Sequence, residues 1–156
     1  MEEKIERTLF FIKPDCETPK IDKASALEII AFLENKLEKD FKRVFGKRTK
    51  DLPEEFYRDF YSQLEKDWPD VLEKMSTEFT DKSIAVFVYE GPNIMQRIRD
   101  IMGPRLYEEN IGEGTIRELF GTSDMGYKTV VHASDKEGKR KDFLVFKKWN
   151  LIPDYL

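Results

Sequence analysis

Two continuous apolar runs, far apart in the sequence, restrict the fold of this chain most strongly. Thr8–Ile12 and Ser83–Tyr89 are rich in aromatic and β-branched residues, and charged residues flank both runs. Such runs are typical of strands that are buried in the middle of a sheet. The chain is therefore expected to build a sheet whose faces are covered by helices.

Helical periodicity fills the sequence between the expected strands. The spacing of apolar residues predicts helices over residues 24–40, 53–66, 69–75, 92–103 and 137–149. In the first of these helices, Leu27, Ile30, Leu37 and Phe41 form the expected core-facing stripe. Residues 105–114 contain few apolar anchors, which predicts a long loop.

Two weaker strands complete the pattern. Residues 43–50 contain only Val44 and Phe45 as apolar residues, so they are expected at an edge of the sheet. Residues 129–132 supply the last expected strand. This order of strands and helices predicts an α/β protein, more closely an α+β sandwich with a ferredoxin-like four-stranded sheet covered by helices. It leaves open whether the sheet is antiparallel or mixed.

Length and composition fit one globular domain over residues 1–156. The chain is 40% hydrophobic, which suffices for a core of its own. No apolar run approaches the ~18 residues of a membrane span, and the charged start lacks the apolar stretch of a signal peptide. The net charge of −4 argues against a nucleic-acid partner. The one cysteine, Cys16, excludes an internal disulfide, fits a cytoplasmic protein and is interpreted as an ordinary loop residue.

His132 is the only histidine in the chain, and it lies where the last expected strand meets a turn. Val130 and Val131 precede it as buried strand residues, and Ser134 and Asp135 follow it. Imidazole is the side chain best suited to carry a proton or a phosphoryl group near neutral pH. A histidine that merely ends a strand and bonds to a neighbour is the alternative interpretation.

Four cations stand out from the mixed-charge background by their positions. Lys13 ends the first strand, Arg99 lies on the polar face of its helix, Arg105 opens the long loop, and Arg117 follows Gly114-Thr115-Ile116. Singly, each is expected to be a solvated surface charge. Together with a histidine nucleophile, they match what phosphoryl transfer requires. The sequence contains no glycine-rich phosphate loop, so side chains would have to hold a nucleotide.

Four segments resemble, in order and spacing, the nucleoside diphosphate kinase family. They are Arg7–Asp15, Glu90–Asn93, Gly114–Arg117 and Val131–Asp135. The resemblance runs from Arg7 to about Trp149. It implies a ferredoxin-like fold and transfer of the γ-phosphoryl group of a nucleoside triphosphate to a nucleoside diphosphate through a phosphohistidine. It also implies Mg²⁺ on the phosphates and a homo-oligomer.

The resemblance assigns roles to individual residues. His132 matches the phosphorylated histidine, and Ser134 matches the serine that supports it. Lys13 matches the lysine that serves ribose and phosphate, and Tyr57 matches the tyrosine near the active site.

The phosphate ligands include one departure from the family. Arg99 and Arg117 match its two phosphate arginines. The family usually has a phosphate-binding threonine where this chain has Arg105, which is expected either to replace that ligand or to pair with Glu108 or Glu109 on the surface. Thr129 replaces the ribose-binding asparagine of the family and keeps only a hydroxyl.

Two further roles depend on small shifts in spacing. The glutamate that hydrogen-bonds the catalytic imidazole falls at Asp142 if one residue is missing before it, and at Phe143 by strict counting. Trp68 is the best candidate for stacking on the base, with packing at a helix junction as the alternative.

Three functions follow from these residues. The first is an active nucleoside diphosphate kinase whose partners are nucleoside di- and triphosphates. The second is a catalytically weak module with the family fold that binds nucleotide or a protein partner. The third is a nucleic-acid-binding domain, supported only by the basic and aromatic content of residues 42–50. No membrane partner is expected.

Overall fold

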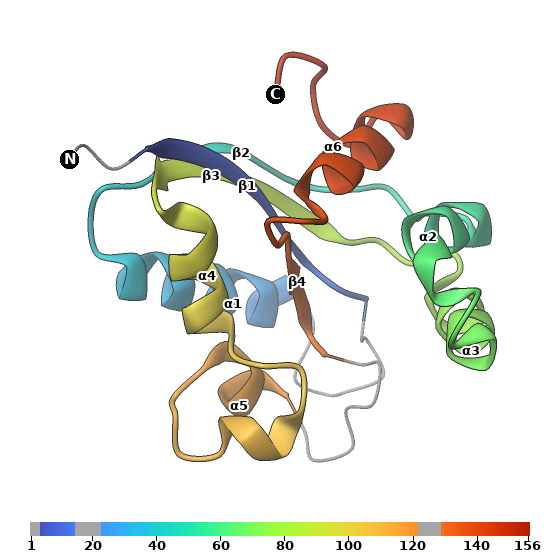
Figure 1. Ribbon diagram of the computed structural model, residues 1–156, viewed down its shortest axis with the longest axis horizontal. Coiled ribbons are helices and arrows are strands. Elements are labelled where there is room, and N and C mark those ends of the chain that lie inside the picture. The colour runs from blue at the N-terminus through green and yellow to red at the C-terminus, as the bar shows by residue number, and fades with distance from the viewer. Residues whose placement is uncertain (1–3, 15–22, 122–128) are drawn as a thin grey trace.

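The computed structural model describes residues 4–14, 23–121 and 129–156 (Figure 1). Its strands are β1 (Ile5–Ile12), β2 (Lys42–Arg48), β3 (Ala85–Pro92) and β4 (Val131–Ala133). They form one sheet in the order β2-β3-β1-β4, and every neighbouring pair is antiparallel. This arrangement confirms the four-stranded α+β sandwich, the central position of β1 and the edge position of β2.

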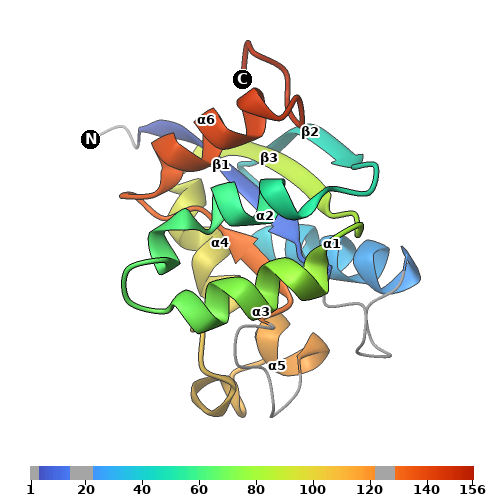
Figure 2. The same cartoon turned by 90° about the vertical axis from the view of Figure 1, so that its right-hand side faces the viewer.

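Helices cover both faces of the sheet (Figures 1 and 2). One face packs against α1 (Lys23–Leu37), α4 (Ile94–Met102) and α5 (Ile116–Phe120). The other face packs against α2 (Glu54–Phe60), α3 (Pro69–Phe79) and α6 (Lys139–Lys148). Side chains alternate along β1, so Phe10 and Ile12 enter the first core while Leu9 and Phe11 enter the second.

Several expected boundaries differ from the observed ones. The helix expected over 53–66 ends at Phe60, and a short 3₁₀ segment, Ser62–Leu64, leads to the break at Trp68-Pro69. The next helix extends to Phe79 because Leu72, Met75 and Phe79 continue its buried stripe. A second 3₁₀ segment, Tyr107–Asn110, lies in the expected loop, and α5 follows it without having been expected.

The predicted core stripe of α1 is wrong at one position. Leu27 is 74% exposed, and the core instead receives Ala26, Ile29, Ile30, Leu33 and Leu37. The helix is therefore rotated about its own axis relative to the predicted orientation, so that Ala26 and Leu33 face the core and Leu27 faces away from it. Among the described residues, no helix is long and apolar enough to cross a membrane. Cys16 lies outside the described residues.

Candidate active site

His132 occupies the middle of β4 rather than its end, because the strand runs from Val131 to Ala133. The segment that enters this strand has an unusual backbone. Val130 adopts a φ of 69°, in the left-handed region that a β-branched residue rarely occupies. The carbonyl of Val130 accepts a 2.8 Å hydrogen bond from the backbone N–H of Lys13, which ties this turn to the end of β1. The surrounding fold thus holds a costly conformation two residues before the histidine.

A carboxylate from α6 orients the imidazole. Nε2 of His132 lies 2.8 Å from Oδ2 of Asp142, and the hydroxyl of Ser134 donates to the same oxygen at 2.6 Å. Both Ser134 and Asp142 are buried. The structure therefore brings His132 together with the two residues predicted to support it, and it places Asp142, not Phe143, beside the ring.

Burial lowers the pKa of His132 below its ordinary value of 6.5. Asp142 acts in the opposite direction and raises this pKa, whereas the nearby charges of Lys13 and Arg117 lower it. The net direction favours a neutral ring near pH 7. A neutral imidazole has a lone pair on one nitrogen, which is the state that a nucleophile needs.

Lys13 and Thr129 form a buried pair next to this turn. The ammonium group of Lys13 donates a 2.8 Å hydrogen bond to Oγ1 of Thr129. It also lies 5.5 Å from the centre of the Tyr61 ring. The hydroxyl at position 129 thus anchors the lysine at the carboxyl end of β1.

The two predicted phosphate arginines donate hydrogen bonds to backbone carbonyls in and next to the strand of the histidine. Arg117 donates to the backbone carbonyls of Gly103, Thr129 and Val131 at 2.9–3.1 Å. Arg99 donates to the carbonyl of Ala133 at 3.1 Å. The segment 129–134 contains three of the predicted residues, Thr129, His132 and Ser134. Four more make hydrogen bonds with it: Lys13, Arg99, Arg117 and Asp142.

Three predicted residues lie outside this cluster. Tyr57 is 1% exposed, and its hydroxyl donates to the carbonyl of Lys82 at 2.5 Å, within the core of α2 and α3. Trp68 is 63% exposed at the start of α3, so packing at a helix junction does not account for it. Arg105 is exposed beyond α4. Within the part of the chain that the structure describes, it forms no pair with Glu108 or Glu109.

Sequence reasoning missed the aromatic residues around His132. Phe11 stacks on the imidazole with ring centres 4.9 Å apart, and Phe60 meets it edge-on at 5.2 Å. Tyr61, one turn after Tyr57, is the tyrosine that contacts Lys13. No local signal identifies these side chains, because their proximity depends on how β1, β4 and α2 pack.

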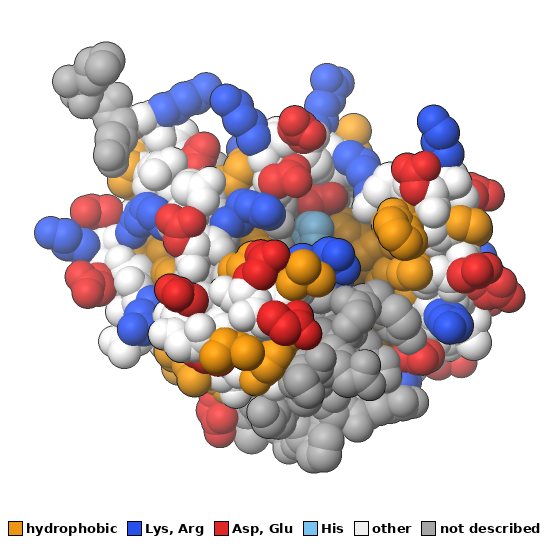
Figure 3. Space-filling model, turned by 60° about the horizontal axis from the view of Figure 1, so that its bottom comes forward, with side chains coloured by type: hydrophobic (Ala, Val, Ile, Leu, Met, Phe, Trp, Pro, Cys, Tyr) orange, Lys and Arg blue, Asp and Glu red, His pale blue; other side chains and the backbone are white. Residues whose placement is uncertain are grey.

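The surface around the histidine is hollowed. Figure 3 shows the histidine, in pale blue, set back from the surface with Lys or Arg side chains beside it and hydrophobic side chains on one flank. Its side chain is 28% exposed, so a ligand can reach it.

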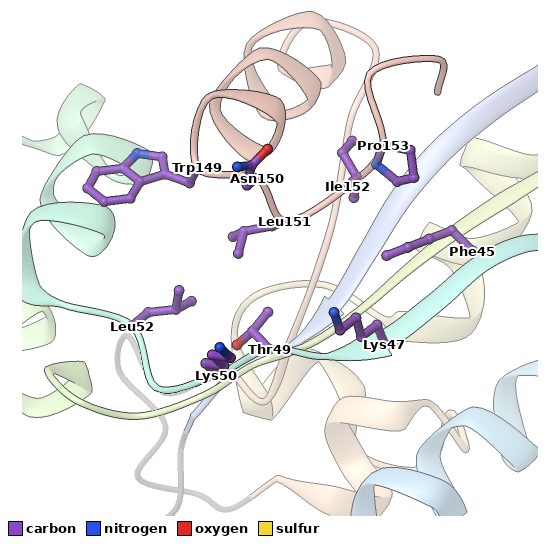
Figure 4. A pocket seen from close by; sticks show the side chains of 10 residues that line it. All are labelled: Phe45, Lys47, Thr49, Lys50, Leu52, Trp149, Asn150, Leu151, Ile152 and Pro153. Carbon is purple, nitrogen blue, oxygen red and sulfur yellow. The ribbon is translucent and has the colours of Figure 1, made fainter.

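A separate cavity of about 500 Å³ lies between the end of β2 and the C-terminal segment (Figure 4). Phe45, Leu52, Trp149 and Leu151 contribute apolar lining, and two lysines stand beside them. Its described lining contains neither a histidine nor a carboxylate. This cavity therefore lacks the residue types predicted to carry the chemistry, which lie around His132 instead.

A histidine oriented by a carboxylate and surrounded by cations, on an antiparallel four-stranded sheet, defines the class of phosphotransferases that work through a histidine. The comparisons with known proteins specify that class. The sequence model of nucleoside diphosphate kinase matches residues 6–149. The chain belongs to the nucleoside diphosphate kinase family.

Individual relatives agree with this assignment. The chain is 36% identical over 137 residues to a nucleoside diphosphate kinase of Persephonella marina, covering 88% of this chain and 89% of that protein. The crystal structure of the Aquifex aeolicus enzyme is 26% identical with a TM-score of 0.68, covering 92% and 95% of the two chains. The Halobacterium salinarum enzyme in complex with CDP is 26% identical with a TM-score of 0.72, covering 92% and 88%.

Proposed function

We propose that this protein moves the γ-phosphoryl group of a nucleoside triphosphate to a nucleoside diphosphate by a ping-pong reaction through His132. The hydrogen bond between Nε2 and Asp142 carries this proposal. It engages one ring nitrogen, and within the described residues no hydrogen bond occupies Nδ1. The lone pair of a neutral ring is therefore available on Nδ1, while the proton on Nε2 is held by the carboxylate.

The reaction needs only this nitrogen and the incoming phosphates. Nδ1 attacks the γ-phosphorus, the bond between that phosphorus and the bridging oxygen breaks, and the nucleoside diphosphate leaves with the electron pair. The ring then carries a positive charge that Asp142 stabilises through Nε2–H. A β-phosphate oxygen of the second diphosphate attacks the phosphorus, and the P–N bond breaks to restore the neutral ring.

Cations close to the histidine balance the phosphate charge. We assign this role to Lys13, Arg99 and Arg117, with Arg105 reaching from the loop and Trp68 stacking on the base. Thr129 is assigned to the ribose side of the site. Within residues 4–14, 23–121 and 129–156, no cluster of acidic, histidine or cysteine side chains is suited to hold a metal ion. Mg²⁺ would therefore be held by phosphate oxygens and would neutralise part of their charge.

The rest of the proposal concerns assembly and location. We propose that residues 1–156 act as one domain, that the protein forms a homo-oligomer, and that it works in the cytoplasm, where its nucleotide substrates are found. Light scattering coupled to size-exclusion chromatography tests the assembly, and a mass equal to one chain would contradict it.

Phosphorylation of the protein itself tests the proposed reaction. Incubation with ATP and Mg²⁺ should increase the intact mass by one phosphoryl group, and acid should remove that group. ADP formed in this step and exchange into a second nucleoside diphosphate should both be lost in His132→Ala. Residual exchange within tenfold of the parent would contradict the role of His132. Nucleotide binding without exchange by the parent would instead favour the catalytically weak module.

A further inference from the structure

We propose that Phe11 and Phe60 form an aromatic clamp that fixes the ring of His132 for phosphoryl transfer, so that both are positioning residues of this enzyme. The inference rests on the proposed function for its kinetic consequence. Its structural part concerns only the imidazole and the two phenyl rings.

The sheet register places Phe11 directly opposite the histidine. In the antiparallel pairing of β1 with β4, Phe11 is the partner of His132. Directly opposed side chains on one face of such a pair lie close enough to contact. The two rings are nearly parallel, with an interplanar angle of 24° and centres 4.9 Å apart. Phe11 thus covers one face of the imidazole.

Phe60 restrains the ring from a second direction. Its ring is nearly perpendicular to the imidazole, at 86°, with centres 5.2 Å apart. It also meets Phe11 edge-on at 5.3 Å, so the three rings form one contact cluster. Edge-to-face and stacked contacts at these distances are the favoured aromatic geometries.

Lys141 fixes Phe60 to the helix that carries Asp142. Its ammonium group donates to the backbone carbonyl of Phe60 and, at 2.7 Å, to Oε1 of Gln63. It also lies 4.7 Å from the centre of the Phe60 ring. The lysine thus connects the end of α2 to α6 beside the catalytic carboxylate.

These contacts leave the imidazole little freedom. Phe11 and Phe60 oppose tilting of the ring, and Asp142 holds Nε2. Transfer to phosphorus requires the attacking lone pair to be aligned with the breaking bond, and small misplacements of a reactive group slow a reaction strongly. The clamp therefore prealigns Nδ1 before a nucleotide arrives.

The charged groups around His132 are separate from this clamp. Asp142 on α6, Lys13 at the end of β1 and Arg117 on α5 all influence its charge. Arg99 on α4 and Lys141 on α6 also lie near its strand or its clamp. None of them is changed in the variants below, so a change in the imidazole can be assigned to the aromatic rings.

Phe146 offers a matched control within the same core. It is fully buried and lies 5.5 Å from the Phe11 ring and 5.4 Å from the Phe60 ring. Among the described residues it has no ring contact with His132. Phe11→Leu, Phe60→Leu and Phe146→Leu remove the same atoms from one cluster, but only the first two change the clamp.

The experiment uses the sole histidine of the chain as an unambiguous NMR probe. In the parent, the ¹⁵N shifts of the neutral ring should show one tautomer with the proton on Nε2. Phe11→Leu and Phe60→Leu should give a mixture of tautomers and an imidazole pKa closer to 6.5, because water reaches the ring. Phosphorylation by ATP in a single turnover should slow by about tenfold or more, with the Kd for ADP unchanged.

The control defines the result that would overturn the clamp. Phe146→Leu should keep the parent tautomer, pKa and rate even if its thermal stability falls as far. Equal effects in all three variants, or parent-like spectra and rates in the first two, would refute the proposal. If Phe11→Leu does not fold, Phe60→Leu decides the question. The titration needs no turnover, so loss of the clamp is distinguishable from failure of the kinase assignment.

Discussion

Oδ2 of Asp142 lies 2.8 Å from Nε2 of His132, across the contact between α6 and β4. The same oxygen accepts a hydrogen bond from the hydroxyl of Ser134. A single carboxylate oxygen therefore contacts both His132 in β4 and Ser134 just after this strand. This contact engages Nε2, and among the described residues no hydrogen bond engages Nδ1. It also determines in which direction a change at Asp142 shifts the pKa of His132.

Asp142→Asn should slow phosphorylation of His132 by about tenfold to a hundredfold, since a hydrogen bond to a charged group contributes about 1.5–3 kcal/mol. It should also lower the pKa of His132 further, because the carboxylate raises that pKa. Rapid-quench kinetics and NMR titration measure the two effects. Ser134→Ala, which removes only the second hydrogen bond, should have a smaller effect on both. A rate within twofold of the parent in Asp142→Asn would contradict the assignment.

Arg117→Ala should weaken both the fold and nucleotide binding, whereas Arg99→Ala should weaken mainly binding. Among the described residues, Arg117 donates to three backbone carbonyls and Arg99 to one. We expect Arg117→Ala to lower the free energy of unfolding by about 2–4 kcal/mol, because buried acceptors lose their donors. Urea denaturation and ADP titration separate the two effects. If both variants bind ADP like the parent, the phosphate site lies elsewhere.

Arg105→Thr should change the KM for nucleotide or the turnover several-fold and leave thermal stability nearly unchanged. Arg105 is exposed and has no ion pair with Glu108 or Glu109 in the described chain, so its removal costs little folding energy. Added salt should weaken nucleotide binding more in the parent than in the variant. Arg105→Lys is the control that keeps the charge. Parent-like kinetics in Arg105→Thr would assign this side chain to the solvated surface.

Trp68→Ala should raise the KM for purine and pyrimidine nucleotides alike, because stacking uses a face that every base has. The expected loss is about 1–3 kcal/mol of binding. Trp149→Phe is the control. The indole N–H of Trp149 donates to Asp59 at 2.8 Å, so this variant should lose thermal stability while its KM stays constant. Steady-state kinetics with several nucleotides and thermal melts test the pair. An unchanged KM in Trp68→Ala would remove the base-stacking role.

Stability should fall as the pH decreases through the range just below 6.5, in part because of His132. Its pKa is lowered by burial in the folded state, so the unfolded chain binds more protons between the folded pKa and 6.5. Above 6.5 this penalty is absent. His132→Gln should lose this part of the pH dependence, as measured by urea denaturation at matched pH values. Identical profiles for the two proteins would show that the histidine is not buried in its neutral form.

Much of the fold follows from local sequence. The apolar runs at Thr8–Ile12 and Ser83–Tyr89 became central strands, and the break at Trp68-Pro69 separates α2 from α3. Most candidate site residues were also recognisable from their positions in the sequence, but Phe11 and Phe60 were not. Spacing did not identify the tyrosine next to the lysine: the predicted Tyr57 lies in the core, and Tyr61 contacts Lys13.

The sequence by itself determined the four strands, most of the helices, the histidine and its cations, because periodicity and residue chemistry are local properties. Tertiary structure alone decided which of these residues meet. Lys13 and Thr129 are 116 positions apart, and their hydrogen bond depends on the pairing of β1 with β4. The same register sets Phe11 against His132, and the packing of α2 and α6 brings in Phe60 and Asp142. Strand register and helix packing arise from interactions between distant segments, which local periodicity does not encode.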